Sequence, residues 1–97
     1  MKTCTYHGRP VKIKVESYRN NGHLALLMYP EGDDYGYVIT TNLNSPLQSD
    51  TLAFLDTNNF PGIEKFITRN HIGVSMGVSE RSGFCQYPLF HIFTDAL

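Results

Sequence analysis

The sequence lacks several features that mark particular classes of protein. It contains no tryptophan, only two cysteines in 97 residues, and a formal net charge of −1. Proteins that neutralise many phosphates usually carry a clear basic excess, and mimics of double-stranded DNA carry a clear acidic one. The near balance of charge therefore disfavours both classes, although it leaves room for a small local patch.

Long apolar runs are also missing. No stretch of about 18 apolar residues is present, so we expect no membrane-spanning segment. Residues 1–7 lack the apolar core of a signal peptide. We therefore expect a cytoplasmic protein whose two thiols, Cys4 and Cys85, stay reduced rather than joined in a disulfide.

The remaining composition is typical of a folded chain. Hydrophobic residues make up 41% of the sequence and charged residues 18%, which argues against disorder. A length of 97 residues suits one domain and is short for two hydrophobic cores. We expect a single domain over residues 1–97.

Hydrophobic alternation predicts a sheet-rich chain. Residues 11–16 place valine and isoleucine on one face and charges on the other, and Arg19–Gly22 is a strong hairpin signal. Residues 74–83 are expected to form a loop or an irregular edge, and Pro88 predicts an edge position or a bulge. The expected strands are residues 3–6, 11–16, 23–29, 35–41, 51–56 and 84–93.

One short helix is predicted after the fifth strand. Residues 57–61 read as its start, because an Asn side chain can cap free amides and Pro61 is tolerated in a first turn. An apolar stripe follows, and the helix should end within residues 70–73, where Asn or Gly can adopt a left-handed conformation. The stripe consists of Phe60, Ile63, Phe66 and Ile67.

The predicted fold class is α+β. We expect an antiparallel meander sheet of about five to six strands, either open or curled into a partial barrel, with one short helix packed on one face. A helix of about ten residues is roughly 15 Å long and can cover one sheet face but not two. Yet residues 24–29 and 87–93 are apolar at both odd and even positions, unlike half-solvated strands.

Three arrangements would cover the second face of such a sheet. The sheet can curl, with the segments 42–50 and 74–83 folded over the remainder. A symmetric dimer can bury the face, or a different partner can. The last two arrangements would make the protein an interaction module.

Residue types for catalysis and metal binding are present but poorly spaced. Cys4, His7, Cys85 and His91 are all possible zinc ligands. Residues three apart on a strand point to opposite faces and residues six apart are about 20 Å from one another, whereas zinc holds its ligands within about 2.3 Å. This spacing disfavours a metal site.

The same holds for covalent catalysis. Cys85, His91 or His23, and Asp56 are the residue types of a nucleophilic triad, but no nucleophile-elbow sequence surrounds any serine or cysteine. The glycines are spaced as turn residues and form no phosphate-binding loop. We therefore predict a protein that is not an enzyme and has no cofactor.

Exposed aromatic side chains are the best candidates for contact with a protein partner or a second copy of the chain. As an alternative, Arg81 with the neighbouring aromatic residues would stack on a nucleotide or a nucleic-acid base. The candidate partner-binding residues are Tyr29, Tyr35, Tyr37, Arg81, Phe84, Tyr87 and Phe90.

Four segments resemble a family of small uncharacterised proteins carried on conjugative and integrative elements of Gram-positive bacteria. The resemblance lies in residues 18–25, 37–43, 53–61 and 82–89, of which Ser82-Gly83-Phe84-Cys85-Gln86-Tyr87-Pro88-Leu89 is the most distinctive. It implies no assigned activity or site. It implies a gene on a mobile element in a bacterial cytoplasm, where small accessory proteins often block a host defence system or serve conjugation.

Overall fold

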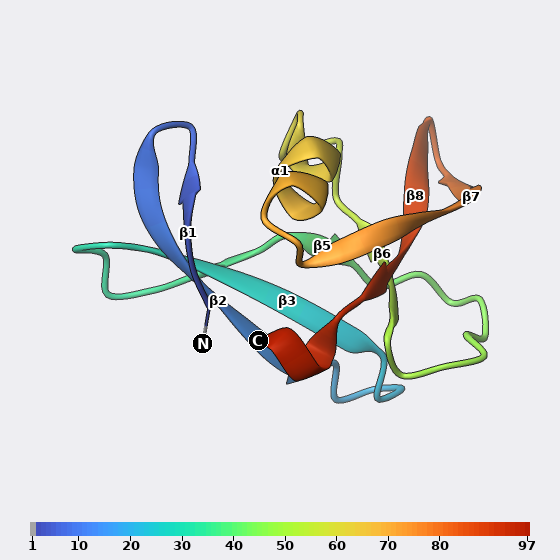
Figure 1. The fold of residues 1–97 in the computed structure, drawn as a ribbon. Coiled ribbons are helices and arrows are strands. Elements are labelled where there is room, and N and C mark those ends of the chain that lie inside the picture. Colours follow the sequence, from blue (N-terminus) through green and yellow to red (C-terminus); the bar gives the residue numbers. More distant parts are fainter. Residues whose placement is uncertain (1) are drawn as a thin grey trace.

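Two four-stranded antiparallel sheets and one short helix make up the fold (Figure 1). The computed structural model describes residues 2–97. The first sheet has the order β1 (Lys2–Tyr6), β2 (Arg9–Ser17), β3 (Leu24–Pro30), β4 (Tyr37–Val38). The second has the order β5 (Thr40–Thr41), β6 (Leu52–Leu55), β8 (Cys85–Ile92), β7 (Gly73–Ser82). Helix α1 (Ile63–Arg69) precedes β7, and a 3₁₀ turn, η1 (Thr94–Ala96), follows β8.

The predicted α+β class with a mostly antiparallel sheet is confirmed. The predicted single meander is only roughly matched, because four consecutive strands form a meander and the rest form a separate sheet. The described strands do not close into a barrel.

The two sheets meet at Ile39 and Thr40. The Ile39 N–H donates to the Leu26 carbonyl of the first sheet (3.0 Å), and its own carbonyl accepts from the Asp56 N–H beside the second (2.9 Å). The Thr40 hydroxyl accepts the Leu26 N–H (3.3 Å) and lies 2.9 Å from the Tyr18 hydroxyl. The expected single strand 35–41 therefore bends here and serves both sheets.

The hydrophobic core fills the space between the sheets and beneath α1. β3 contributes its even positions, and α1 contributes the predicted apolar stripe, with Phe60 packed at the border. The inner face of each sheet is thus covered by the other sheet and by the helix. The fully buried side chains include Val11, Ile13, Leu26, Ile39, Leu55, Ile63, Ile67, Ile72, Phe90 and Ile92.

The outer face of β3 lies beside charged side chains of β2. Lys12 lies opposite Tyr29, and Lys14 lies opposite Leu27, on the outer face of the first sheet. The long aliphatic stems of lysine can cover apolar neighbours while the charged ends stay in water. Leu27 and Tyr29 are accordingly only partly exposed.

Residues 74–83 were predicted to form a loop or an irregular edge, and the irregular edge is confirmed, because β7 is the outer strand of its sheet and has a register irregularity. Valine and methionine alternate there with serine and glycine, a strand pattern that the small residues obscured. A register irregularity between Ser75 and Ser79 lies beside Pro88, which pairs with Ser79, and Gly77 within it has a φ of 78°. The predicted bulge is therefore confirmed, whereas an edge position for Pro88 is wrong because β8 runs between β6 and β7.

The helix lies where the sequence predicted it, with different caps. Gly62, with a φ of 83°, precedes α1 and no side chain caps the helix start, so the expected Asn cap is wrong. The Asn59 side chain instead donates to the Asp56 carboxylate (2.8 Å) and closes the preceding turn. At the other end the left-handed residue is His71, with a φ of 56°, rather than an Asn or Gly.

Candidate functional site

The candidate partner-binding residues fall into two separate surface groups, with one residue in the core. Tyr29, Tyr35 and Tyr37 lie around β4 in the first sheet, whereas Arg81, Phe84 and Tyr87 lie at the β7–β8 hairpin of the second. In Figure 1 the two groups belong to elements on opposite sides of the molecule. They do not form one surface.

Phe90 was expected at an exposed face, and this expectation is wrong. Its side chain is 1% exposed and packs in the core, because it lies opposite Ala53 on the inner face of the second sheet. Its neighbours in β8, Leu89 and His91, point to the outer face instead and remain partly exposed.

The tyrosine group is held together by ring contacts. The rings of Tyr35 and Tyr37 meet edge-on with centroids 5.7 Å apart, and Tyr37 meets Phe60 at 6.4 Å. Tyr29 packs against the backbone of Gly36, where an added Cβ would lie 2.8 Å from the ring. These contacts give most of the rings an intramolecular partner, although Tyr35 remains 64% exposed.

The β7–β8 hairpin is the more exposed group. Phe84 at its turn is 100% exposed, and Val74, Met76 and Val78 along β7 are also exposed. We call Val74, Met76, Val78 and Phe84 the hairpin edge. β7 is the outer strand of its sheet, so one of its two sides has no strand partner within residues 2–97.

Arg81 and Tyr87 belong to the same hairpin as Phe84. The Arg81 Nε donates to the Gly83 carbonyl (3.4 Å), which turns the guanidinium toward the hairpin backbone. The cavities described below are lined by other residues.

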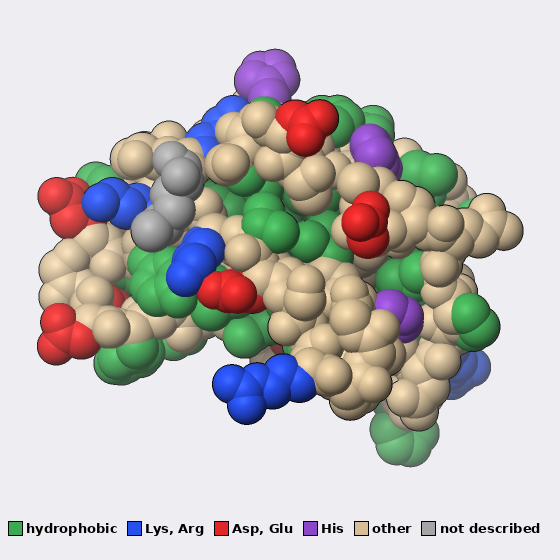
Figure 2. Space-filling view, turned by 90° about the horizontal axis from the view of Figure 1, so that it is seen from below, with side chains coloured by type: hydrophobic (Ala, Val, Ile, Leu, Met, Phe, Trp, Pro, Cys, Tyr) green, Lys and Arg blue, Asp and Glu red, His purple; other side chains and the backbone are tan. Residues whose placement is uncertain are grey.

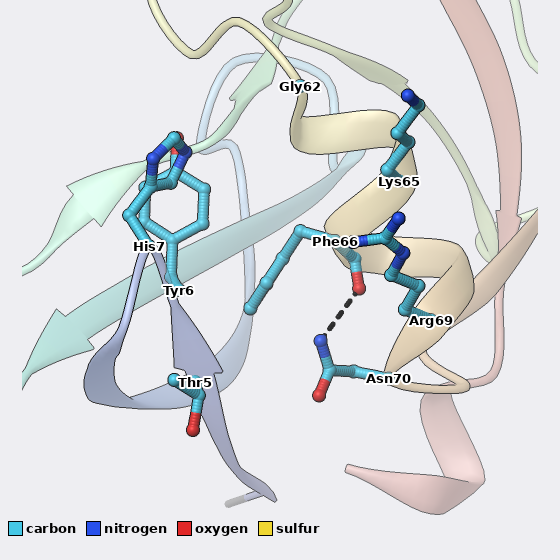
Figure 3. Close-up of a pocket in the computed structure, with 8 residues that line it drawn as sticks. All are labelled: Thr5, Tyr6, His7, Gly62, Lys65, Phe66, Arg69 and Asn70. Atoms are coloured by element: carbon cyan, nitrogen blue, oxygen red, sulfur yellow. Dashed lines mark hydrogen bonds between the residues drawn. The ribbon is translucent and has the colours of Figure 1, made fainter.

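A groove separates β1 from α1 (Figure 3). The rings of Tyr6 and Phe66 meet edge-on across it, with centroids 5.2 Å apart, and form its floor. A cavity of about 300 Å³ lies on one side of this contact and an adjoining cavity of about 330 Å³ on the other, both bordered by Tyr6 and His7. Lys65 and Arg69 of α1 stand along the first cavity.

Two of the residues considered for a catalytic triad, His91 and Asp56, make contacts with other polar side chains. The His91 Nδ1 lies 3.0 Å from the Thr51 hydroxyl, and the Asp56 carboxylate accepts from Asn59, so both are occupied in structural contacts. Cys4 is buried, which raises the pKa of its thiol, and both cysteines are free. Within residues 2–97 no three His, Cys, Asp or Glu side chains are grouped so that they could hold a metal ion.

The surface carries no dominant charge on the side shown in Figure 2. Basic and acidic side chains are interspersed there, and hydrophobic side chains reach the surface in areas broken by polar atoms. In the described part of the chain, no helix has the length and apolar character needed to cross a membrane.

Comparison with known families places the chain. The model of a domain of unknown function, DUF4313, matches residues 12–97. The chain belongs to this family. No curated protein and no solved structure matches the chain significantly. The matched range of the DUF4313 domain contains the hairpin edge and α1, whereas β1 precedes it.

Sequence reasoning missed the groove of this DUF4313 protein. The sequence could have indicated its cationic wall, since Lys65 and Arg69 are four residues apart in a segment predicted to be helical and so lie on one face of the helix. The sequence could not have indicated the opposite wall, because nothing in residues 2–7 shows that β1 lies at the sheet edge beside α1.

Proposed function

We propose that this DUF4313 protein is a non-enzymatic binding module that contacts a protein partner through the hairpin edge. The observation that carries the proposal is the complete exposure of Phe84. Burial of a phenylalanine side chain contributes roughly 1.5–3 kcal/mol, and exposed aromatic anchors of this kind often dominate binding energy. A fully exposed ring at a hairpin turn gains this free energy only when a partner covers it.

The neighbouring strand supports the same surface. Proteins usually protect outer strands by making them short or by adding charges to them. β7 has ten residues and carries no charge from Gly73 to Ser79. Its bulge twists the strand, and the Ser45 hydroxyl of segment 42–50 donates to the Glu80 carboxylate near its end. Val74, Met76 and Val78 extend the apolar contact of Phe84 along this strand.

The biological setting follows from the resemblance to proteins of conjugative and integrative elements. We propose a cytoplasmic bacterial protein encoded on such an element. Its partner would then be a host protein. Blocking a host defence system is one accessory role that suits a small binding module, and service in conjugation is the other.

Affinity purification with matched variants tests the proposal. The tagged wild type, Phe84→Asp and Tyr35→Asp are each incubated with lysate of a host bacterium. Tyr35→Asp is the control, because it puts the same charge on an exposed aromatic position at the other end of the molecule. We expect a protein that is retained by the wild type and by Tyr35→Asp but not by Phe84→Asp.

Substitution of the fully exposed Phe84 should change stability by less than about 0.5 kcal/mol, and circular dichroism checks that Tyr35→Asp, which loses the ring contact with Tyr37, is folded. Equal retention by all three proteins, or a loss caused by Tyr35→Asp alone, contradicts the assignment. Light scattering that shows a dimer lost in Phe84→Asp would make a second copy the partner. Salt-dependent retention on a nucleic-acid column that Arg81→Ala abolishes would favour the nucleic-acid alternative instead.

A further inference from the structure

One wall of the groove is a free strand edge. β1 is the outer strand of its sheet and pairs only with β2 within residues 2–97. Thr5 lies opposite Pro10, whose carbonyl accepts from the Glu31 N–H on the β3 side (2.9 Å). In an antiparallel pair of strands, directly opposed residues alternate between two kinds. In one kind the backbone N–H and C=O groups bond to each other, and in the other kind they point away from each other. The backbone N–H and C=O of Thr5, and by alternation those of Thr3, therefore point away from β2, toward the free edge.

The free edge of β1 faces α1. In Figure 1 and Figure 3, β1 lies between β2 and the helix, and Phe66 reaches from α1 toward Tyr6. Thr5 and His7 border the same cavity as the helical residues. The cavity of about 300 Å³ thus lies between an incompletely hydrogen-bonded strand and a helix, and its size is typical of ligand pockets.

The helical wall is cationic. Lys65 and Arg69 are one turn apart, and neither forms an ion pair in the described part of the chain, where the ion pairs are Arg9–Asp33 and Lys14–Glu16. Like charges at this spacing destabilise a helix by about 0.2–0.5 kcal/mol. No Asp or Glu borders this cavity. The wall is therefore complementary to an anionic ligand.

An apolar socket continues the groove beyond Tyr6. Its volume is about 330 Å³, and Met28, Pro30, Tyr37 and Phe60 line it. The guanidinium of Arg9 at its border is already engaged, 3.0 Å from an Asp33 carboxylate oxygen. An apolar side chain is the group that this socket fits best.

We propose that the groove binds an extended acidic peptide segment of a protein partner. The peptide backbone pairs with the free edge of β1, carboxylate side chains contact Lys65 and Arg69, and one apolar side chain enters the socket. Addition of a strand to a free sheet edge is an established mode of peptide recognition, in which neighbouring pockets supply the specificity. A nucleotide would use the cations and the socket but would leave the strand edge without partners. This site shares no residue with the hairpin edge and goes beyond the function proposed above.

Selection from a random-peptide library displayed on phage, against the immobilised full chain, tests this proposal. We expect selected sequences with two or more acidic residues and one apolar residue. Fluorescence anisotropy of a labelled selected peptide should show binding about tenfold weaker for Lys65→Glu or Arg69→Glu, since loss of one charge contact costs about 1.4 kcal/mol. Arg19→Glu is the matched control, an exposed cation in the turn between β2 and β3 away from the groove, and should change binding by less than about twofold. Bound peptide should also slow hydrogen exchange at the Thr3 and Thr5 amides.

Several outcomes overturn the proposal. They are a failure to select peptides, a consensus without acidic residues, binding that Lys65→Glu and Arg69→Glu do not weaken, and unchanged exchange at Thr5. Binding of ATP that Arg69→Glu abolishes, without peptide binding, would assign the groove to nucleotides. The neutral variants Lys65→Gln and Arg69→Gln replace the charge reversals if these unfold α1. Phe84→Asp should leave peptide binding unchanged, so the two proposals fail independently.

Discussion

Replacing Thr40 with valine is the sharpest test of how the two sheets are joined. The Thr40 side chain is 4% exposed, and its hydroxyl lies within hydrogen-bond distance of the Leu26 N–H and of the Tyr18 hydroxyl. Leu26 lies opposite Val15 of β2. Because bonded and non-bonded pairs alternate along the two strands, the backbone N–H and C=O of Leu26 point away from β2. A side chain therefore satisfies a backbone amide at the point where the first sheet ends.

The size of the effect follows from these two contacts. An unsatisfied buried N–H costs about 1–3 kcal/mol, and loss of the Tyr18–Thr40 hydrogen bond costs about 0.5–1.5 kcal/mol. The methyl group that valine introduces recovers up to about 0.8 kcal/mol through burial. We expect Thr40→Val to lower the free energy of unfolding by about 1–3 kcal/mol, which for a domain of this size lowers Tm by about 4–8 °C per kcal/mol.

Urea unfolding followed by circular dichroism measures this change. Tyr18→Phe removes only one of the two contacts and should cost about 0.5–1.5 kcal/mol. The double variant should cost less than the sum of the single variants by a similar amount, because both remove the same hydrogen bond. A Thr40→Val protein within about 0.5 kcal/mol of the wild type, or strictly additive variants, would refute the role of Thr40 as the link between the sheets.

Two further predictions concern packing and pH. Gly73→Ala should destabilise the protein by at least about 1–3 kcal/mol in the same assay, because the new Cβ would lie 2.5 Å from a backbone carbonyl oxygen of β8. Gly77→Ala is the control, with open space around the Cβ and only the cost of a φ of 78°, about 1–2 kcal/mol, so a larger loss there would contradict the reasoning. Burial is the largest cause of the raised pKa of Tyr18, whose usual value is 10.0, so the folded protein holds this proton to higher pH than the unfolded chain. The contribution of this group to the free energy of unfolding is present below about pH 10 and is lost as the pH rises further. In Tyr18→Phe the free energy of unfolding should therefore depend less on pH across this range. An equal dependence in both proteins would show that Tyr18 is not responsible.

Local patterns predicted the elements of this chain better than their assembly. The alternation of residues 11–16 and the apolar stripe of α1 are properties of a few neighbouring residues, and both segments fold as expected. The division into two sheets depends on a bend at Ile39, whose neighbours are all β-formers and carry no glycine or proline to mark it. Sheet-on-sheet packing then covers the inner faces that the lone helix could not.

The candidate site was predicted in part for the same reason. The turn at Gly83 is visible in the sequence and accounts for the exposure of Phe84, although residues 74–83 were predicted as a loop or irregular edge and Phe84 as the start of a strand. The burial of Phe90 could not be predicted from the sequence, because both faces of residues 87–93 are apolar. Only the position of β6 in the folded sheet decides which face turns inward. The groove depends on the neighbourhood of β1 and α1, which are more than 50 residues apart in the chain.

The bend at Ile39 has a consequence for how the family can vary in length. Residues 37–41 set the register of β4 against β3 and of β5 against β6 within five positions. One inserted or deleted residue here would turn a buried side chain to the opposite face in at least one of the sheets, because side chains alternate with a period of two. The neighbouring segment 42–50 joins two paired strands without belonging to either. Side-chain hydrogen bonds hold Asn42 to Asn20 and Asn21 and hold Ser45 to Glu80, but residues 46–50 have no strand register to keep. Natural length changes in this half of the domain should accumulate there, with residues 37–41 keeping a constant count.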